Sequence, residues 1–367
     1  MLSLPQFGPP PLSHFDFVPF PGSFLDMTRR AGGIALDSMG LGPVPTPSVI
    51  VERTSGMKLR AYHDPRSAPG PDLLILPAPI KRPYIWDLMP SVSVVRRALG
   101  AGLRVWLVDW TETGYSEDFG LAHYADAFPL AACDAIETAT GATSVLVAGH
   151  SIGGSLAAIF ASLHPERVRG LALIEAPLAF GASRGPIGDF LAGVDGRTAA
   201  SVGLGGPVAG VLLSAAGVAA APDDFVRQPL LDLYEVGSDP VRAAIHLRVL
   251  RWTLDEFAMP RRLLAEIIED LYRGDRYARD ELVIGGRRTG ASGLRAPTAA
   301  VIVRAASVVP IESATRPLSA LPRERRRVFQ AKSERGAMLQ HVAPLVGPTA
   351  HASVWPPLLA WLKGLPE

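Results

Sequence analysis

Short apolar runs alternate with segments of helical spacing between residues 72 and 177, and this alternation restricts the fold more than any other feature. Strands that alternate with helices are typical of a parallel α/β sheet, because each helix carries the chain back to the start of the next strand. Two further runs, VIVER and LRAYH, predict an opening hairpin. The buried strands predicted after the hairpin are 72–79, 104–110, 144–149 and 170–177.

The alternation stops after residue 177. Residues 178–280 contain a Gly/Ala-rich section and then helix-like runs, without a clear buried strand. Strand-like runs return at 298–306 and 325–333, and a helix follows at the end of the chain. We therefore predict one sheet domain made of 46–177 and 281–367, with a helical cap or lid inserted at 178–280. The alternative is that the middle segment is an ordinary helical layer of the core.

Composition and net charge exclude several classes of protein and of site. Residues 1–45 are rich in Pro, Gly and Phe and predict an extended arm without a core of its own. A net charge of +1 argues against nucleic-acid binding, which needs a strong basic excess. The single cysteine, Cys133, excludes an internal disulfide framework and a cysteine zinc site, and we expect no metal and no cofactor.

The sequence shows no basic segment followed by an apolar one at its start, so we expect no signal peptide. The longest small-apolar run, 208–221, is too short to span a bilayer, so we expect no transmembrane segment. A cytoplasmic location is the default expectation, and a homodimer is left open.

One motif points to chemistry. Residues 149–153 read Gly-His-Ser-Ile-Gly, a G-x-S-x-G between a predicted strand and a predicted helix. That context is the one required by the nucleophile elbow of α/β-hydrolases, in which glycines allow a very tight turn. Ser151 is therefore the candidate nucleophile, and a merely structural turn is the alternative. The N–H of Ile152, at the helix start, is predicted to face the developing oxyanion.

A second oxyanion donor is expected from the loop after strand 72–79. Pro77 and Pro79 have no N–H, which leaves Ala78, Ile80 and Lys81. Ile80 is our candidate among these three.

A serine needs a base, usually a histidine that follows the last strand of this fold. His341 lies directly after the predicted last strand, and His351 is the alternative ten residues later. His150, beside the nucleophile, is predicted to point away from the cleft and to be a packing residue.

The acid of the triad is harder to locate. No carboxylate follows the strand at 298–306 until Glu312. Glu175, by contrast, closes a buried apolar strand, where a charge is unfavourable unless it is paired. Glu175 is therefore the candidate acid, with Glu312 or a Ser–His dyad as alternatives. A purely structural ion pair of Glu175 with an arginine such as Arg169 is the competing explanation.

Several separate blocks resemble the polyhydroxyalkanoate synthases: PAPIKRPYIWDLMPSVSVVRRALGAGLRVWLVDW, LHPERVRGLALIEAPLAF, ELVIGGRRTGASGLRAPT, and HVAPLVG with VWPPLLAWL. The resemblance implies the α/β-hydrolase fold and an activity that builds a polyester from hydroxyacyl-CoA. His341 matches the family histidine. Two positions depart from the family: Ser151 stands where it has a cysteine, and Ala306 stands where it has its acid.

Other resemblances bear on these departures. The sequence GHSIGG around Ser151 looks more like that of esterases and thioesterases. Glu175 falls where the haloalkane dehalogenases carry their catalytic acid.

The serine has a chemical consequence. Transfer of an acyl group from a thioester to a serine is downhill, whereas its return to a thiol is uphill. We therefore predict a serine acyl-transfer enzyme, an esterase, thioesterase or acyltransferase. Its substrate would be an apolar acyl or hydroxyacyl ester or thioester, the latter on CoA or a carrier protein. The alternatives are a polymerising synthase that uses serine, and a catalytically inactive α/β-hydrolase that binds a hydrophobic ligand.

Overall fold

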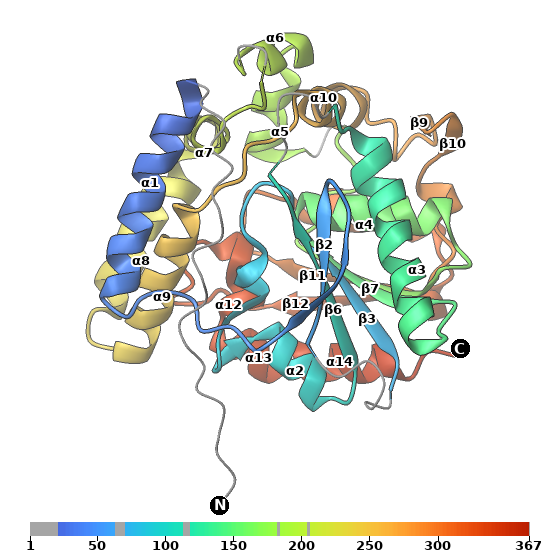
Figure 1. Ribbon diagram of the computed structural model, residues 1–367, viewed down its shortest axis with the longest axis horizontal. Helices are drawn as coiled ribbons and strands as arrows, with labels where there is room; N and C mark the ends of the chain where they lie inside the picture. The colour runs from blue at the N-terminus through green and yellow to red at the C-terminus, as the bar shows by residue number, and fades with distance from the viewer. Residues whose placement is uncertain (1–20, 63–69, 113–117, 182–183, 204–205, 367) are drawn as a thin grey trace, which may run out of the picture.

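The computed structural model describes residues 21–62, 70–112, 118–181, 184–203 and 206–366. An eight-stranded sheet forms its centre (Figure 1). The two strands at one edge are antiparallel to their neighbours, and all pairings from the third strand onward are parallel. The mostly parallel α/β sheet with its opening hairpin is therefore confirmed. In spatial order the strands are β1 (Val49–Arg53), β2 (Met57–Ala61), β6 (Arg104–Trp110), β3 (Asp72–Leu76), β7 (Val145–His150), β8 (Val168–Ile174), β11 (Thr298–Val303) and β12 (Arg326–Ala331).

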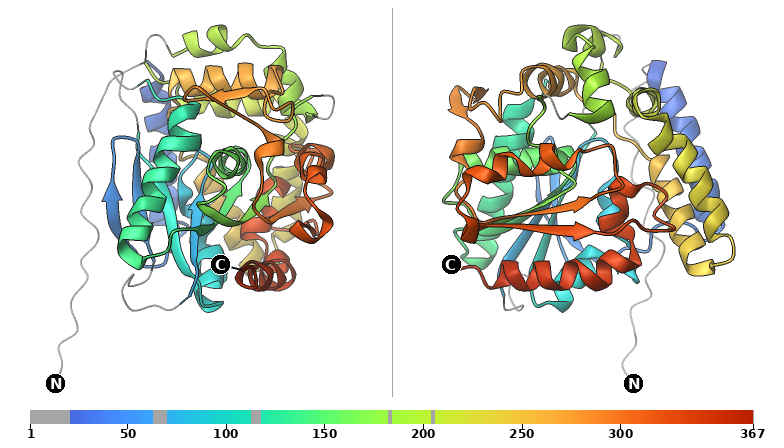
Figure 2. Two further views of the ribbon diagram at one scale, coloured as in Figure 1. Left: turned by 90° about the vertical axis from the view of Figure 1, so that its right-hand side faces the viewer. Right: turned by 180° about the vertical axis from the view of Figure 1, so that it is seen from behind.

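Helices cover both faces of the sheet (Figure 2). In β3, Leu73 and Ile75 belong to one buried cluster and Leu74 and Leu76 to the other, because successive strand residues face opposite sides. One cluster includes α3 (Phe128–Thr140) and α4 (Ile152–Leu163). The other includes α2 (Val94–Gly100), α12 (Ala343–Val346), α13 (Pro348–Ser353) and α14 (Trp355–Lys363).

Helical elements occupy the chain between β8 and β11, where the sequence predicted an insertion. Its function as a lid stays a prediction. The elements are α5 (Gly185–Ala192), α6 (Gly196–Ser201), α7 (Gly210–Ala220), η3 (Asp223–Arg227), α8 (Gln228–Val236), α9 (Pro240–Thr253), α10 (Arg261–Glu266) and η4 (Ile267–Arg273).

Short elements complete the chain, and two small hairpins among them were not predicted. The hairpins pair β4 (Asp87–Met89) with β5 (Val92–Ser93) and β9 (Leu282–Ile284) with β10 (Arg287–Thr289). The other elements are η1 (Pro83–Trp86), η2 (His123–Ala127), η5 (Ala291–Gly293), α11 (Ile311–Thr315), η6 (Pro317–Ala320), η7 (Arg323–Arg325) and η8 (Gln340–Val342). Among the helices of the described ranges, none is long and apolar enough to cross a membrane.

The prediction of an extended arm over residues 1–45 is wrong for Pro21–Ser38, which form helix α1; residues 1–20 lie outside the described ranges. Helix α1 lies beside α7 and α9 (Figure 1). Polar side chains of α1 make part of this contact: Asp26 accepts hydrogen bonds from the first two amides of α7, Gly210 and Val211. Arg29 pairs with Glu256 at 2.9 Å.

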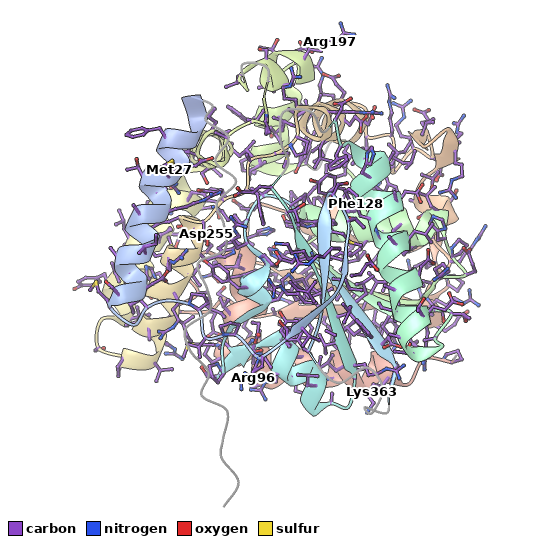
Figure 3. All side chains as sticks on the ribbon, viewed as in Figure 1. Met27, Arg96, Phe128, Arg197, Asp255 and Lys363 are labelled. Atoms are coloured by element: carbon purple, nitrogen blue, oxygen red, sulfur yellow. The ribbon has the colours of Figure 1, made fainter. Side chains whose placement is uncertain are left out.

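Several apolar side chains of α1 are exposed: Phe24, Ile34 and Met27, the last of which is labelled in Figure 3. Because apolar periodicity marks the buried face of most helices, a helix docked through polar groups gives no such signal.

Candidate active site

The turn between β7 and α4 holds Ser151 in a strained backbone conformation. Its φ is 55° and its ψ is −136°, in a region that L-residues rarely adopt. The neighbouring glycines are sterically required. A Cβ on Gly153 would lie 2.5 Å from the carbonyl carbon of Pro77, and one on Gly149 would lie 2.6 Å from the carbonyl oxygen of Gly153. The strand–turn–helix context predicted for the motif is therefore present.

Ser151 lines a cavity of about 720 Å³. This volume lies in the range of pockets that enclose a whole small ligand, about 300–1,000 Å³. Its walls come from both the sheet domain and the helical insertion, and most of them are apolar. The apolar lining includes Ile80, Ile85, Trp86, Ile187, Phe190, Leu191, Leu213, Phe225, Trp252, Met259, Leu264, Ile267, Tyr272 and Leu339.

His341 lies in η8, after the last strand, and lines the same cavity. Burial lowers the pKa of His341 to about 4, although the charge of Asp224 acts in the opposite direction. The imidazole is therefore neutral at pH 7, which is the protonation state that a base requires. Within the described residues, no hydrogen bond joins the Ser151 hydroxyl to this ring. Catalytic hydrogen bonds are often long in the absence of substrate.

His150 does not point away from the cleft, so that prediction is wrong. Its Nε2 donates to the backbone carbonyl of His341 at 2.9 Å, and the centroids of the two rings are 4.5 Å apart. The loop that carries His341 folds over the end of β7, so the last residue of that strand contacts it. His150 thus supports the position of His341, a contact that the spacing of the motif did not indicate.

Glu175 follows the last residue of β8 and is 1% exposed, with a positive φ of 47°. Its Oε1 accepts a hydrogen bond from the N–H of Val303 at 2.6 Å, and its Oε2 lies 3.4 Å from Nδ1 of His341. Burial raises the pKa of Glu175 to about 8, and the Val303 N–H only partly opposes this. The guanidinium of Arg169 instead donates to the carbonyl of Leu365. The structure thus brings Glu175 to His341 and not to the arginine.

The alternative residues lie elsewhere. His351 is fully buried in α13, and its Nε2 donates to the carbonyl of Leu345 at 2.7 Å. Glu312 is exposed in the first turn of α11. Ala306, in the place of the family acid, is buried among apolar residues.

The candidate oxyanion donors lie at the elbow and in the loop after β3. Ile152 begins α4, and both Ile152 and Ile80 line the cavity. The carbonyl of Ile80 accepts a hydrogen bond from Phe257 at 2.8 Å, which ties the loop to the chain after α9. The amide nitrogen of Ala78 packs against Gly153 in the first turn of α4, so Ala78 also stays a candidate.

No group of three or more His, Cys, Asp or Glu side chains in the described ranges is arranged to hold a metal ion.

Comparisons with known proteins agree with this architecture. Residues 86–199 match the family described as the alpha/beta hydrolase fold. The poly(3-hydroxyalkanoate) polymerase subunit PhaC of Haloferax mediterranei is 25% identical over 340 residues, which are 92% of this chain and 68% of that protein. The subunit of the same name from Allochromatium vinosum is 24% identical over 351 residues, which are 92% of this chain and 95% of that protein.

Solved structures share the fold at lower sequence identity. The monoacylglycerol lipase of Paleococcus ferrophilus superposes with a TM-score of 0.53 at 15% identity, over 84% of this chain and 99% of that one. The carboxylesterase CesB of Bacillus subtilis superposes with a TM-score of 0.51 at 15% identity, over 94% and 99%. The chain is therefore an enzyme of the hydrolase and acyltransferase type with the α/β-hydrolase fold, similar in sequence to the poly(3-hydroxyalkanoate) polymerases over most of its length.

Proposed function

We propose that this enzyme transfers an apolar acyl or hydroxyacyl group from an ester or thioester through an acyl-Ser151 intermediate. The observation that carries the proposal is that Ser151 and His341 line one apolar cavity, with Glu175 next to the histidine. Ser151 occupies the strained turn, and His341 lines the same cavity with Glu175 at its Nδ1.

The reaction starts with attack of the Ser151 Oγ on the acyl carbonyl carbon. Nε2 of His341 takes the hydroxyl proton, and the carboxylate of Glu175 accepts the Nδ1–H and stabilises the imidazolium. The N–H of Ile152 and a second amide, for which Ile80 is our candidate, hold the oxyanion.

The bond to the leaving group then breaks, and His341 returns the proton to the departing alkoxide or thiolate. A second acceptor, activated by the same imidazole, attacks the acyl-serine. Its proton passes to Nε2 and then to the Ser151 oxygen as the ester bond to the enzyme breaks.

The nature of the nucleophile favours certain acceptors. An oxygen ester lies lower in free energy than a thioester, so acyl transfer from a thioester to Ser151 is downhill. Onward transfer to water, an alcohol or an amine is also accessible, whereas return to a thiol is uphill. Hydrolysis or transfer to an oxygen or nitrogen acceptor is therefore the favoured outcome.

A second candidate function is polyester synthesis from a hydroxyacyl thioester. The observation in its favour is the similarity to poly(3-hydroxyalkanoate) polymerases over 92% of the chain. The acceptor in that case is the hydroxyl group of the growing chain, which is also an oxygen nucleophile.

One set of experiments tests the proposal and separates the two functions. A fluorophosphonate probe should label the wild type and not Ser151→Ala, with intact-mass spectrometry as the readout. Incubation with p-nitrophenyl butyrate should then release free acid, and incubation with 3-hydroxybutyryl-CoA should release free acid or, if the enzyme polymerises, build oligoesters. Ser151→Cys, the residue of the resembling family, is the matched variant for this comparison. Labelling that persists in Ser151→Ala would place the nucleophile elsewhere, and an unlabelled wild type would indicate a non-catalytic protein.

A further inference from the structure

A buried carboxylate from the helical insertion reaches the loop that carries His341. Asp232 lies on α8 and is 8% exposed. Its Oδ1 accepts the N–H of Gly336 at 2.7 Å, and its Oδ2 accepts the N–H of Met338 at 2.9 Å. The Nδ1 of His246, on α9, lies 2.7 Å from the same Oδ2. Asp232 therefore joins two helices of the insertion to the segment that ends at the candidate base.

That segment has an unfavourable backbone conformation. Gly336 has a φ of 84°, and Met338, which carries a side chain, has a φ of 61°. A non-glycine residue keeps a left-handed conformation only where its surroundings hold it there. Gly336 is also confined, because a Cβ at this position would lie 2.9 Å from the carbonyl oxygen of Arg242. The two amides that Asp232 binds are the amides of these two left-handed residues.

The carboxylate is suited to this contact because it stays ionised. Burial alone would raise the pKa of Asp232. Hydrogen bonds from His246 and from the backbone amides of Gly336 and Met338 outweigh burial and hold the pKa below its ordinary value. An ionised acceptor makes stronger hydrogen bonds to backbone N–H groups than a neutral one.

The loop that carries His341 also lines the cavity. Met338, Leu339 and Gln340 all line it, together with His341. A shift at Met338 is therefore passed along three peptide bonds to the imidazole. The backbone carbonyl of His341 has a separate anchor in His150, so loss of the Asp232 contacts should displace the ring only in part.

We propose that Asp232 is a positioning residue for His341: it holds the left-handed turn at Gly336–Met338 so that the imidazole faces Ser151 and Glu175. The inference rests on the proposed function of His341 as the base. It makes the efficiency of the base depend on the helical insertion, because the anchoring group belongs to α8.

Asp232→Asn is the decisive variant. An asparagine has one acceptor oxygen, so at most one of the two loop amides keeps its partner, and the other faces an NH₂ group. We expect the rate constant for acylation of Ser151 to fall by about 10- to 100-fold, as for a small misplacement of a catalytic group. KM should change little, because Asp232 does not line the cavity. Hydrogen exchange at the amides of Gly336 and Met338 should accelerate.

Glu235→Gln is the matched control. Glu235 lies on the same helix and pairs with Arg335 of the same loop at 3.1 Å, but this pair is exposed. The control should keep the wild-type acylation rate.

The outcomes separate this inference from the proposed function. If the wild type is not acylated at Ser151, the proposed function fails, and the inference fails with it. If the wild type is acylated and Asp232→Asn reacts at the same rate with only a lower Tm, Asp232 is structural and the inference is overturned. If Asp232→Asn does not fold, His246→Gln removes one partner and leaves both loop amides bound. It should show a smaller loss of acylation rate, and an unchanged rate in that variant overturns the inference.

Discussion

Replacement of Glu175 by glutamine should separate a catalytic acid from a structural one. The N–H of Val303 donates to Oε1 at 2.6 Å, so the amide oxygen of glutamine takes that position. The NH₂ group then faces Nδ1 of His341 and donates to it. The proton of the neutral imidazole moves to Nε2, the nitrogen that must accept the proton of Ser151. Glu175→Gln therefore keeps the shape of the site and inverts the tautomer of the base.

The size of the effect follows from the distance between the two groups. A carboxylate and an imidazolium 3.4 Å apart attract by about 5 kcal/mol at an effective dielectric constant of about 20. That energy corresponds to about 10³–10⁴-fold in rate, because each 1.36 kcal/mol is about tenfold. We expect the acylation rate constant of Glu175→Gln to fall by this factor.

The pH dependence gives a second signature. Burial raises the pKa of Glu175 to about 8, so this carboxyl group is mostly protonated at pH 7. A protonated Glu175 donates to Nδ1 and produces the same inactive tautomer as glutamine. The acylation rate of the wild type should therefore rise between about pH 7 and pH 9, and this rise should be absent from the variant.

Removal of a structural ion pair would lower the free energy of unfolding, whereas we do not expect Glu175→Gln to lower it at pH 8. The pKa of the folded state, about 8, lies above the ordinary value of 4.5, so the folded protein keeps a proton that the unfolded chain releases in this window. Stability of the wild type relative to the variant is therefore greatest below pH 4.5 and is lost as the pH rises through 8. Glu175→Gln should be at least as stable as the wild type at pH 8.

Stopped-flow acylation with p-nitrophenyl butyrate and thermal unfolding, both between pH 6 and pH 9, measure these quantities. Glu312→Gln is the control, because that carboxylate is exposed and should leave both unchanged. A normal acylation rate with a lower Tm in Glu175→Gln would refute the reasoning and assign Glu175 a structural function.

The remaining predictions concern the base, the elbow and the insertion. His341→Ala should lower the acylation rate by at least about a thousandfold, whereas His351→Ala should mainly lower thermal stability. The reverse pattern would identify His351 as the base in place of His341. Gly153→Ala should lower Tm by several degrees, because its Cβ would lie 2.5 Å from the backbone of Pro77, and an unchanged Tm would contradict that crowding. Residues 185–221, where described, should exchange amide hydrogens rapidly and slow down when a phosphonate occupies Ser151. Slow exchange without the inhibitor would remove the lid hypothesis.

Apolar patterning was sufficient to predict the sheet, because buried parallel strands are continuous apolar runs. It did not predict α1, whose contacts with the rest of the molecule include those of the polar side chains Asp26 and Arg29. Nor did it predict the short β4–β5 and β9–β10 hairpins, which are only two or three residues long in each strand.

For the candidate site, too, the sequence pattern predicted some features and left others unpredicted. Ser151 and His341 were predicted as nucleophile and base from their position after strands, and Glu175 as the acid from the unfavourable burial of a carboxylate; these roles stay predictions. That Ser151 and His341 line one cavity could be inferred only from topology. The orientation of His150 and the contacts of Asp232 depend on where a loop folds back in space, and hydrogen bonds to backbone amides leave no trace in side-chain periodicity.

Helix α1 has a consequence for the order in which the molecule assembles. Its contacts join residues 184 and 227 positions apart, from Asp26 to Gly210 and from Arg29 to Glu256. Contacts that close such long loops form late, because the entropy of loop closure must be lost first. The ribosome completes α1 long before its partners exist, so α7, which lines the cavity, gains its N-terminal cap in a late step. In pulse-labelling hydrogen exchange, the amides of Gly210 and Val211 should become protected after those of β7, and simultaneous protection would contradict this order. The part of the cavity wall that α7 forms is then completed late, although the helix that caps it is the first described helix of the chain.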